Sequence, residues 1–190
     1  MNESKGNIVV GVAGERVFVR VQGKGNYQIS QPFCQFSNEI IKRGFHEFVV
    51  DLGDCSSMDS TFLGVLAGVG LRLMAASGRI HLANLNSRCR EVVASLGIDR
   101  LSTVDMCDIN LASPGNGGGS APAPALEPLA MPQSMPTDPE GRARYAEMVI
   151  EAHTTLMQID PQNVPKFKDC VRFLSEDLEK LRAAQKRSNS

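Results

Sequence analysis

The sequence has no excess of charge of either sign, no hydrophobic run of membrane length and no apolar leader. Its 20 basic and 21 acidic residues leave a formal net charge of -1, which argues against nucleic acid or an anionic membrane as a partner. The longest apolar runs fall well short of the roughly 18 residues that suggest a membrane span. The first residues, MNESKGN, lack the apolar core of a signal peptide. We therefore expect a cytoplasmic protein.

Metal-ligand spacing is also missing. The cysteines are odd in number, widely scattered and never arranged as C-x-x-C; they are Cys34, Cys55, Cys89, Cys107 and Cys170. A buried free thiol packs as a small apolar side chain. His46, His81 and His153 are isolated from one another and from any cysteine pair. We expect neither a metal nor another cofactor.

A change of composition near Ser113 divides the chain. The segment SPGNGGGSAPAPALEPLAMPQSMPTDPEG is rich in glycine, proline and alanine and has no apolar periodicity. Such a segment buries too little surface to offset its ordering entropy, so it is typical of a flexible linker. We therefore expect a head domain over residues 1–110, a linker over 111–137 and a C-terminal unit over 138–190.

The head shows strands that alternate with helices. Two β-branched runs joined at Ala13–Glu15 predict a hairpin. Ser30, two residues before Pro32, predicts the start of a helix, and Ser87 predicts the start of another. The run Phe48–Val50 predicts a strand buried on both faces. The order β-β-α-β-α-β-α-β predicts an α/β fold with a mixed, mostly parallel sheet.

The C-terminal unit carries two helical repeats of apolar residues, typical of an αα-hairpin. The first consists of Tyr145, Met148, Val149, Ala152 and Leu156, and the second of Phe167, Cys170, Val171, Leu174, Leu178 and Leu181. Two helices alone form a thin core. Their apolar faces must therefore dock on the head, on a second copy of the chain or on another protein.

The motif MDSTFLG, residues 58–64, follows an apolar strand and opens a helix. Ser60 has two possible roles there. A serine at a helix start is a preferred N-cap, which contributes about 1 kcal/mol over alanine. A hydroxyl beside the unpaired N–H groups of a helix N-terminus is also well placed to carry a phosphate.

Other chemistry fits this motif poorly. Asp51, Asp54 and Asp59 lack the ligand alternation and the closing glutamate of a calcium loop. Ser60 has no histidine close in sequence and no nucleophile-elbow glycine pattern, which argues against a serine hydrolase. The glycines Gly64, Gly68 and Gly70 do not match a phosphate-binding loop and indicate close helix packing instead. We expect no enzymatic activity.

The segment VVDLGDCSSMDSTFLGVL, in its strand–helix context, resembles the STAS domain of bacterial anti-sigma factor antagonists. The family signature is close to D-S-S/T-G-L-G. The matching residues are Asp59, Ser60, Thr61, Leu63 and Gly64, whereas Phe62 stands in place of the usual glycine. The resemblance covers about residues 8–107 and does not extend to the C-terminal unit.

The resemblance implies a non-enzymatic phosphoprotein of bacterial signal transduction and transcription regulation. In the family, a partner serine kinase, commonly also the anti-sigma factor, phosphorylates the serine after the aspartate, which here is Ser60; Thr61 is the weaker candidate. The unphosphorylated form binds this partner and the phosphorylated form releases it. The implied partner-binding residues are Asp59, Ser60, Thr61, Phe62, Lys24, Asn26 and Tyr27. Asn26 lies nearest the position where family members often carry an aspartate.

An adaptor is the alternative function. In that case the domain self-associates, or its helical tail recruits or oligomerises other proteins, and Ser60 is only a helix cap.

Overall fold

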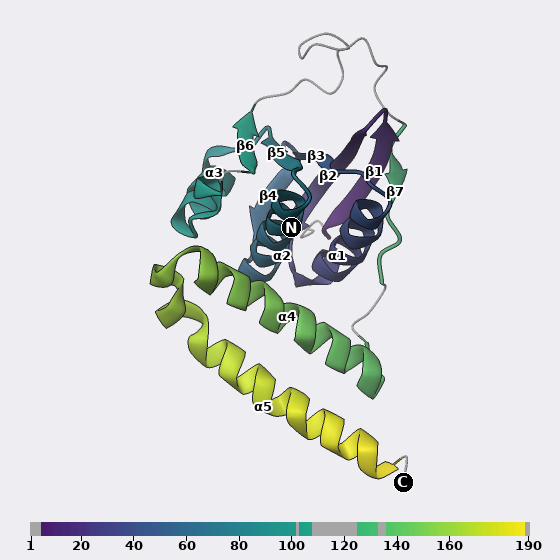
Figure 1. Cartoon of the computed structure of the whole chain (residues 1–190), viewed down its shortest axis with the longest axis vertical. Helices are drawn as coiled ribbons and strands as arrows, with labels where there is room; N and C mark the ends of the chain where they lie inside the picture. The colour runs from purple at the N-terminus through teal and green to yellow at the C-terminus, as the bar shows by residue number, and fades with distance from the viewer. Residues whose placement is uncertain (1–4, 102, 108–124, 133–135, 189–190) are drawn as a thin grey trace.

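The computed structural model describes residues 5–101, 103–107, 125–132 and 136–188 of the chain. Its helices and strands follow one another in the order β1 (Asn7–Ala13), β2 (Arg16–Gly25), α1 (Tyr27–Lys42), β3 (Glu47–Asp51), β4 (Cys55–Met58), α2 (Ser60–Ala75), β5 (Arg79–Ala83), α3 (Ser87–Ser95), η1 (Ile98–Arg100), β6 (Val104–Cys107), β7 (Glu127–Pro128), α4 (Pro139–Ile159), η2 (Pro161–Asn163) and α5 (Val164–Ser188). Figure 1 shows these elements, with the two long C-terminal helices on one side of the head.

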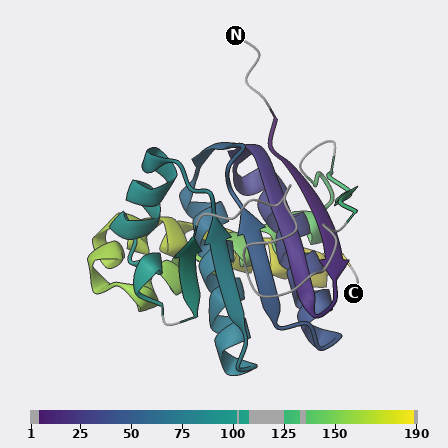
Figure 2. The ribbon, with the colours of Figure 1, turned by 90° about the horizontal axis from the view of Figure 1, so that it is seen from above.

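The strands form one mixed sheet in the order β6-β5-β3-β2-β1-β7, and β4 pairs with the end of β2. The β1–β2 hairpin is antiparallel, whereas β2–β3, β3–β5 and β5–β6 are parallel. Figure 2 shows the strands side by side, with α4 and α5 behind them. The predicted mixed, mostly parallel α/β fold is therefore confirmed.

The core lies between the sheet and the helix pair α1–α2. Along β2, Val17, Val19 and Val21 are buried and alternate with more exposed residues, as the period of a strand requires. The run Phe48–Val50 in β3 is buried throughout, as predicted. In the helix layer the rings of Phe33 and Phe62 lie 5.7 Å apart. Helix α2, which carries the signature, is thus fixed to the core through Phe62.

The helices begin at other residues than expected. Helix α1 is capped by the side chain of Asn26, and Ser30, predicted as the cap, lies inside the helix and donates to the Asn26 carbonyl. Asp59 caps α2 and Asn86, not Ser87, caps α3. The Ser30 hydroxyl bonds to the carbonyl one turn back, which leaves the Asn26 side chain as the cap of α1.

The region expected as a linker contains a strand. Residues of β7 pair antiparallel with Val9 and Val10 of β1, and the amide of Leu129 donates to the Ile8 carbonyl over 2.9 Å. The chain thus returns along the β1 edge of the sheet before α4 begins. Residues 111–124 and 133–135, the greater part of the expected linker, lie outside the described residues.

Helices α4 and α5 pack against each other, and α4 lies between α5 and the head (Figure 1). Helix α4 contacts α2 along much of its length and reaches α1 as well. Ala152 and Leu156 of α4 are buried, and so is Leu178 of α5. Of the three docking partners that the sequence left open, the structure shows the head.

A buried carboxylate ends β3. Asp51 is 6% exposed and accepts hydrogen bonds from Arg20 Nε, Asn84 Nδ2 and the Gly53 amide over 2.9, 2.8 and 3.1 Å. It connects neighbouring strands to the turn before β4. Removing it would leave three donors without their acceptor.

We therefore expect Asp51→Ala to lower the free energy of unfolding by about 2–3 kcal/mol. Urea denaturation measures the change. Glu39→Ala is the control, because the Glu39–Arg43 ion pair is exposed on both sides and contributes less than about 0.5 kcal/mol. Equal stability of the two variants would contradict the structural role of Asp51.

Candidate functional site

The Asp59 carboxylate joins the N-termini of two helices. Its Oδ1 accepts from the Phe62 amide over 2.9 Å and so caps α2. Its Oδ2 accepts from the Tyr27 amide, also over 2.9 Å, at the start of α1. The Asp59 amide donates in turn to the Gly25 carbonyl at the end of β2. A negative charge between two helix N-termini is favoured by both dipoles.

The core beneath this junction leaves no room for a side chain on Gly25. A Cβ there would lie 2.9 Å from Phe62 Cδ1 and 3.0 Å from Met58 Cγ. Phe62 itself is completely buried. It was expected to contact a partner, and this is wrong: a ring that replaces the usual glycine of the signature fills the core instead. Thr61 is 7% exposed, so it too is buried beside the site.

Ser60 is the first residue of α2 and is partly buried. Its hydroxyl oxygen lies 3.0 Å from Nε2 of His153 in α4. The other ring nitrogen, Nδ1, lies 2.9 Å from the Val149 carbonyl, to which it can only donate. In the neutral imidazole Nε2 is then the acceptor, and the Ser60 hydroxyl is the donor.

Sequence reasoning missed His153 as a neighbour of Ser60, because 93 positions separate them. The sequence did contain one indication that His153 faces inward. It follows Val149 by four residues, so the two side chains lie on the same apolar face of the helix. The ring is 5% exposed and lies 4.9 Å from the Phe167 ring of α5, between centroids.

A serine beside a histidine is also the arrangement of an activated nucleophile. Here, however, the histidine is oriented by a backbone carbonyl and sits inside a helix–helix interface. The pair forms a contact between α2 and α4. The absence of a histidine close to Ser60 in sequence, which argued against a hydrolase, therefore does not extend to the folded chain.

The backbones of α2 and α4 approach closely next to this pair. A Cβ on Gly64 would overlap the carbonyl of Ala152 and lie 2.8 Å from its Cβ. About two turns further along α2, Arg72 forms an ion pair with Glu151 at 3.2 Å. Close packing was predicted for the helix glycines, and for Gly64 it is confirmed.

Tyr145 covers the remaining corner of the site. Its ring meets that of Tyr27 edge to face, with the centroids 6.2 Å apart. Burial raises the pKa of the Tyr145 hydroxyl above its ordinary value of 10.0, and the nearby Tyr27 and Asp59 raise it further. The neutral phenol is therefore favoured when α4 is docked.

Of the expected partner-binding residues, Asp59, Ser60, Asn26 and Tyr27 meet at the two helix N-termini. The expected loop from Lys24 to Tyr27 is instead the end of β2 and the start of α1. Tyr27 is 39% exposed. We call the surface formed by Asn26, Tyr27, Asp59, Ser60 and Gly64 the switch face.

Within the described residues, no three His, Cys, Asp or Glu side chains are grouped to hold a metal ion. None of the helices in the same part of the chain has the length and apolar character to cross a membrane.

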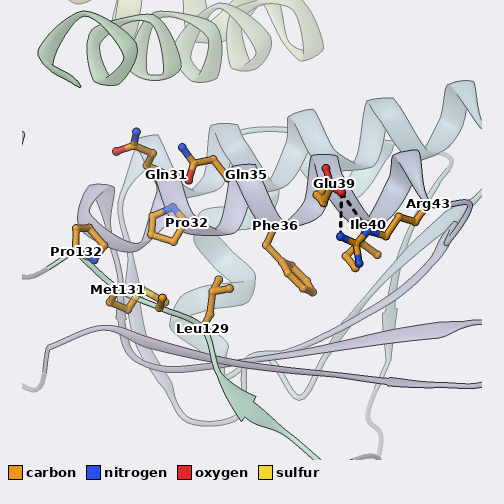
Figure 3. A pocket seen from close by; sticks show the side chains of 11 residues that line it. Gln31, Pro32, Gln35, Phe36, Glu39, Ile40, Arg43, Leu129, Met131 and Pro132 are labelled. Atoms are coloured by element: carbon orange, nitrogen blue, oxygen red, sulfur yellow. Dashed lines mark hydrogen bonds and ion pairs between the residues drawn. The ribbon is translucent and has the colours of Figure 1, made fainter. Parts of the chain in front are cut away.

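A separate groove of about 730 Å³ lies between α1 and the segment 129–132 (Figure 3). Its walls are mainly apolar, with Phe36 and Leu129 facing into it, and the Glu39–Arg43 ion pair lies at one end. Its lining includes no residue of the switch face.

The sheet and helices form a small α/β domain in which the Asp59–Ser60–Thr61 motif lies at the start of α2. The family described as Mlab, STAS domain matches residues 8–105, and the chain belongs to this STAS family. None of the curated proteins compared with it matches.

Solved structures of similar fold include the anti-sigma factor antagonist SpoIIAA in its unphosphorylated form, with 20% identity over 54% of this chain and 88% of that one, at a TM-score of 0.49. A putative anti-sigma factor antagonist from Thermotoga maritima shares 20% sequence identity over 53% of this chain and 85% of that one, at a TM-score of 0.47. The Bacillus cell fate determinant SpoIIAA in the phosphorylated form shares 22% sequence identity over 54% of this chain and 91% of that one, also at a TM-score of 0.47.

Asp59→Ala removes one acceptor from each of two helix starts. We expect it to lower the free energy of unfolding by about 2 kcal/mol, because a cap and a second hydrogen bond are lost together. Asp59→Asn should have a smaller effect, since its amide oxygen still caps α2 while its NH₂ group faces the Tyr27 amide. Urea denaturation checks the order; an alanine variant as stable as the asparagine variant would contradict it.

The raised pKa of Tyr145 gives a pH dependence with a definite sign. The stability from the neutral phenol is fully present below the unfolded pKa of about 10 and is lost as the pH rises through the higher pKa of the docked state. Between about pH 9.5 and 11, the wild type should therefore lose more stability than Tyr145→Phe. Parallel slopes in thermal unfolding would refute this.

Proposed function

We propose that this protein is a phosphorylation-controlled binding module of the anti-sigma factor antagonist type, with Ser60 as the phosphate acceptor. The observation that carries the proposal is the place of the Ser60 hydroxyl: it is the first residue of α2, next to the Asp59 cap and beside the start of α1. The proposed partner is a serine-kinase/anti-sigma protein in the bacterial cytoplasm, bound through the switch face and Lys24.

The chemistry of this position supports a switch. Unpaired N–H groups and the helix dipole at the start of α2 accommodate a phosphate. The phosphate adds about -1.5 to -2 charges at neutral pH. These charges arrive directly beside the Asp59 carboxylate. A surface that presents a neutral hydroxyl becomes strongly anionic, and a partner with an acidic or apolar contact surface is released without any change of fold.

The adaptor function keeps one observation in its favour. Helix α5 exposes Phe173, at 59%, with the Arg172 guanidinium 5.1 Å from the ring centroid, and its first residue, Val164, is 40% exposed. An exposed aromatic on a helix can serve as a contact for another protein. The part of that alternative in which Ser60 is only a cap is wrong, because Asp59 is the cap.

Ser60→Ala should remove phosphorylation and keep the fold, since it loses one hydrogen bond of about 1 kcal/mol and no cap. Mass spectrometry of the full chain after incubation with an extract of its native cells and ATP measures the modification. Ser60→Asp should weaken binding of the partner less than phosphate does, because it carries a single charge.

Thr61→Ala is the matched control, because Thr61 is the neighbouring hydroxyl and is buried. It should be phosphorylated like the wild type. Modification of Ser60→Ala to the wild-type level would sink the switch and leave the adaptor as the better function.

A further inference from the structure

The switch face is already occupied. Helix α4 of the same chain provides His153 to the Ser60 hydroxyl, the Ala152 backbone to Gly64 and the Tyr145 ring to Tyr27. We infer that the switch face is a helix-binding surface whose resident is α4, and that α4 leaves before a kinase or a partner protein reaches Ser60. The second half of this inference rests on the proposed function.

The fit at Gly64 shows that this surface is shaped for a helix. Because Gly64 has no side chain, the α4 backbone at Ala152 lies so close to α2 that a single methyl group on Gly64 would overlap it. Glycine in a helix interior makes the isolated helix less stable than alanine would. At Gly64 this cost is offset by the close packing of α4 against α2.

The docked helix and a phosphate on Ser60 exclude each other. Only 3.0 Å separate the Ser60 oxygen from His153 Nε2, which leaves no space for a phosphoryl group between them. An outward shift of α4 that made room for a phosphoryl group would break the close approach of Gly64 and Ala152. A phosphorylated serine also has no hydroxyl proton to donate to Nε2. Docking therefore protects Ser60, and phosphorylation prevents docking.

The contacts of α4 define the kind of partner that can replace it. Such a partner presents a helix with a small residue against Gly64, an aromatic ring seven residues earlier against Tyr27, and a hydrogen-bond acceptor next to the small residue, against Ser60. In α4 these are Ala152, Tyr145 and His153. A helix of this pattern competes with α4 for the same surface.

Gly64→Ala tests the inference on the full chain. The added methyl group blocks α4 and improves the helix propensity of α2. Gly68→Ala is the control, because it brings the same gain in helix propensity without a clash. The nearest atom to its added Cβ would be Arg72 Nη1, at 3.4 Å, which belongs to the same helix. The reporter is Cys34, which borders the small cavity between α2 and α4 and whose thiol pKa is raised by burial.

N-ethylmaleimide should modify Cys34 at least about tenfold faster in Gly64→Ala than in Gly68→Ala, as measured on the Cys34 peptide by mass spectrometry. Hydrogen exchange should show loss of protection in α4 with β3 still protected. Equal rates at Cys34 would overturn the inference, and so would loss of protection in β3, because the head would then need α4 in order to fold.

Phosphorylation with cell extract and ATP separates the inference from the proposed function. It is measured on Ala152→Leu and on the wild type, because Ala152 is buried against Gly64 and its enlargement displaces α4 without altering the switch face. Faster modification of Ser60 in Ala152→Leu than in the wild type supports both. Fast Cys34 labelling of Gly64→Ala, with no modification of Ser60 in Ala152→Leu or in the wild type, means that α4 is a releasable helix but the proposed function is wrong. Equal modification of Ser60 in Ala152→Leu and the wild type means that the proposed function holds and α4 does not guard the serine.

Discussion

The carboxylate of Asp59 fixes the first turns of two helices at once, and the arrangement of the site follows from this. One oxygen caps α2 and the other holds the start of α1, while the Asp59 amide reaches the end of β2. Ser60 is therefore held beside Tyr27 although the two belong to different helices. The first N–H groups of a helix have no acceptor within the helix, and the carboxylate supplies one for the Phe62 and Tyr27 amides.

Much of the fold could be predicted from the sequence, and the failures have physical causes. The pattern of apolar residues predicted the hairpin, the buried strand β3 and the two C-terminal helices, because in each of them the pattern extends over several residues. The short strands β4 and β7 have too few residues for a pattern. Caps were assigned to Ser30 and Ser87 when Asn26 and Asn86 stood next to the helices, since several capping residues lie close together there.

The candidate site could be predicted only in its local part. Asp59 and Ser60 are adjacent, so the motif itself revealed them. The contact of Ser60 with His153 depends on how α4 docks, and no local pattern encodes a docking orientation. Phe62 was misassigned for a related reason: its position in the motif suggested exposure, but the direction of its side chain is set by the packing of Gly25 and Phe33.

The pairing of β7 with β1 has a consequence for how tightly the tail is tethered. It anchors the chain on the sheet at Pro128, so only residues 129–138 separate the anchor from α4. A short tether keeps a released segment at an effective concentration on the order of millimolar near its own site. A free protein in the cell competes poorly against such a neighbour unless it binds far more tightly. A covalent change at the surface is independent of concentration, and it is the more effective way to keep such a tethered helix from rebinding.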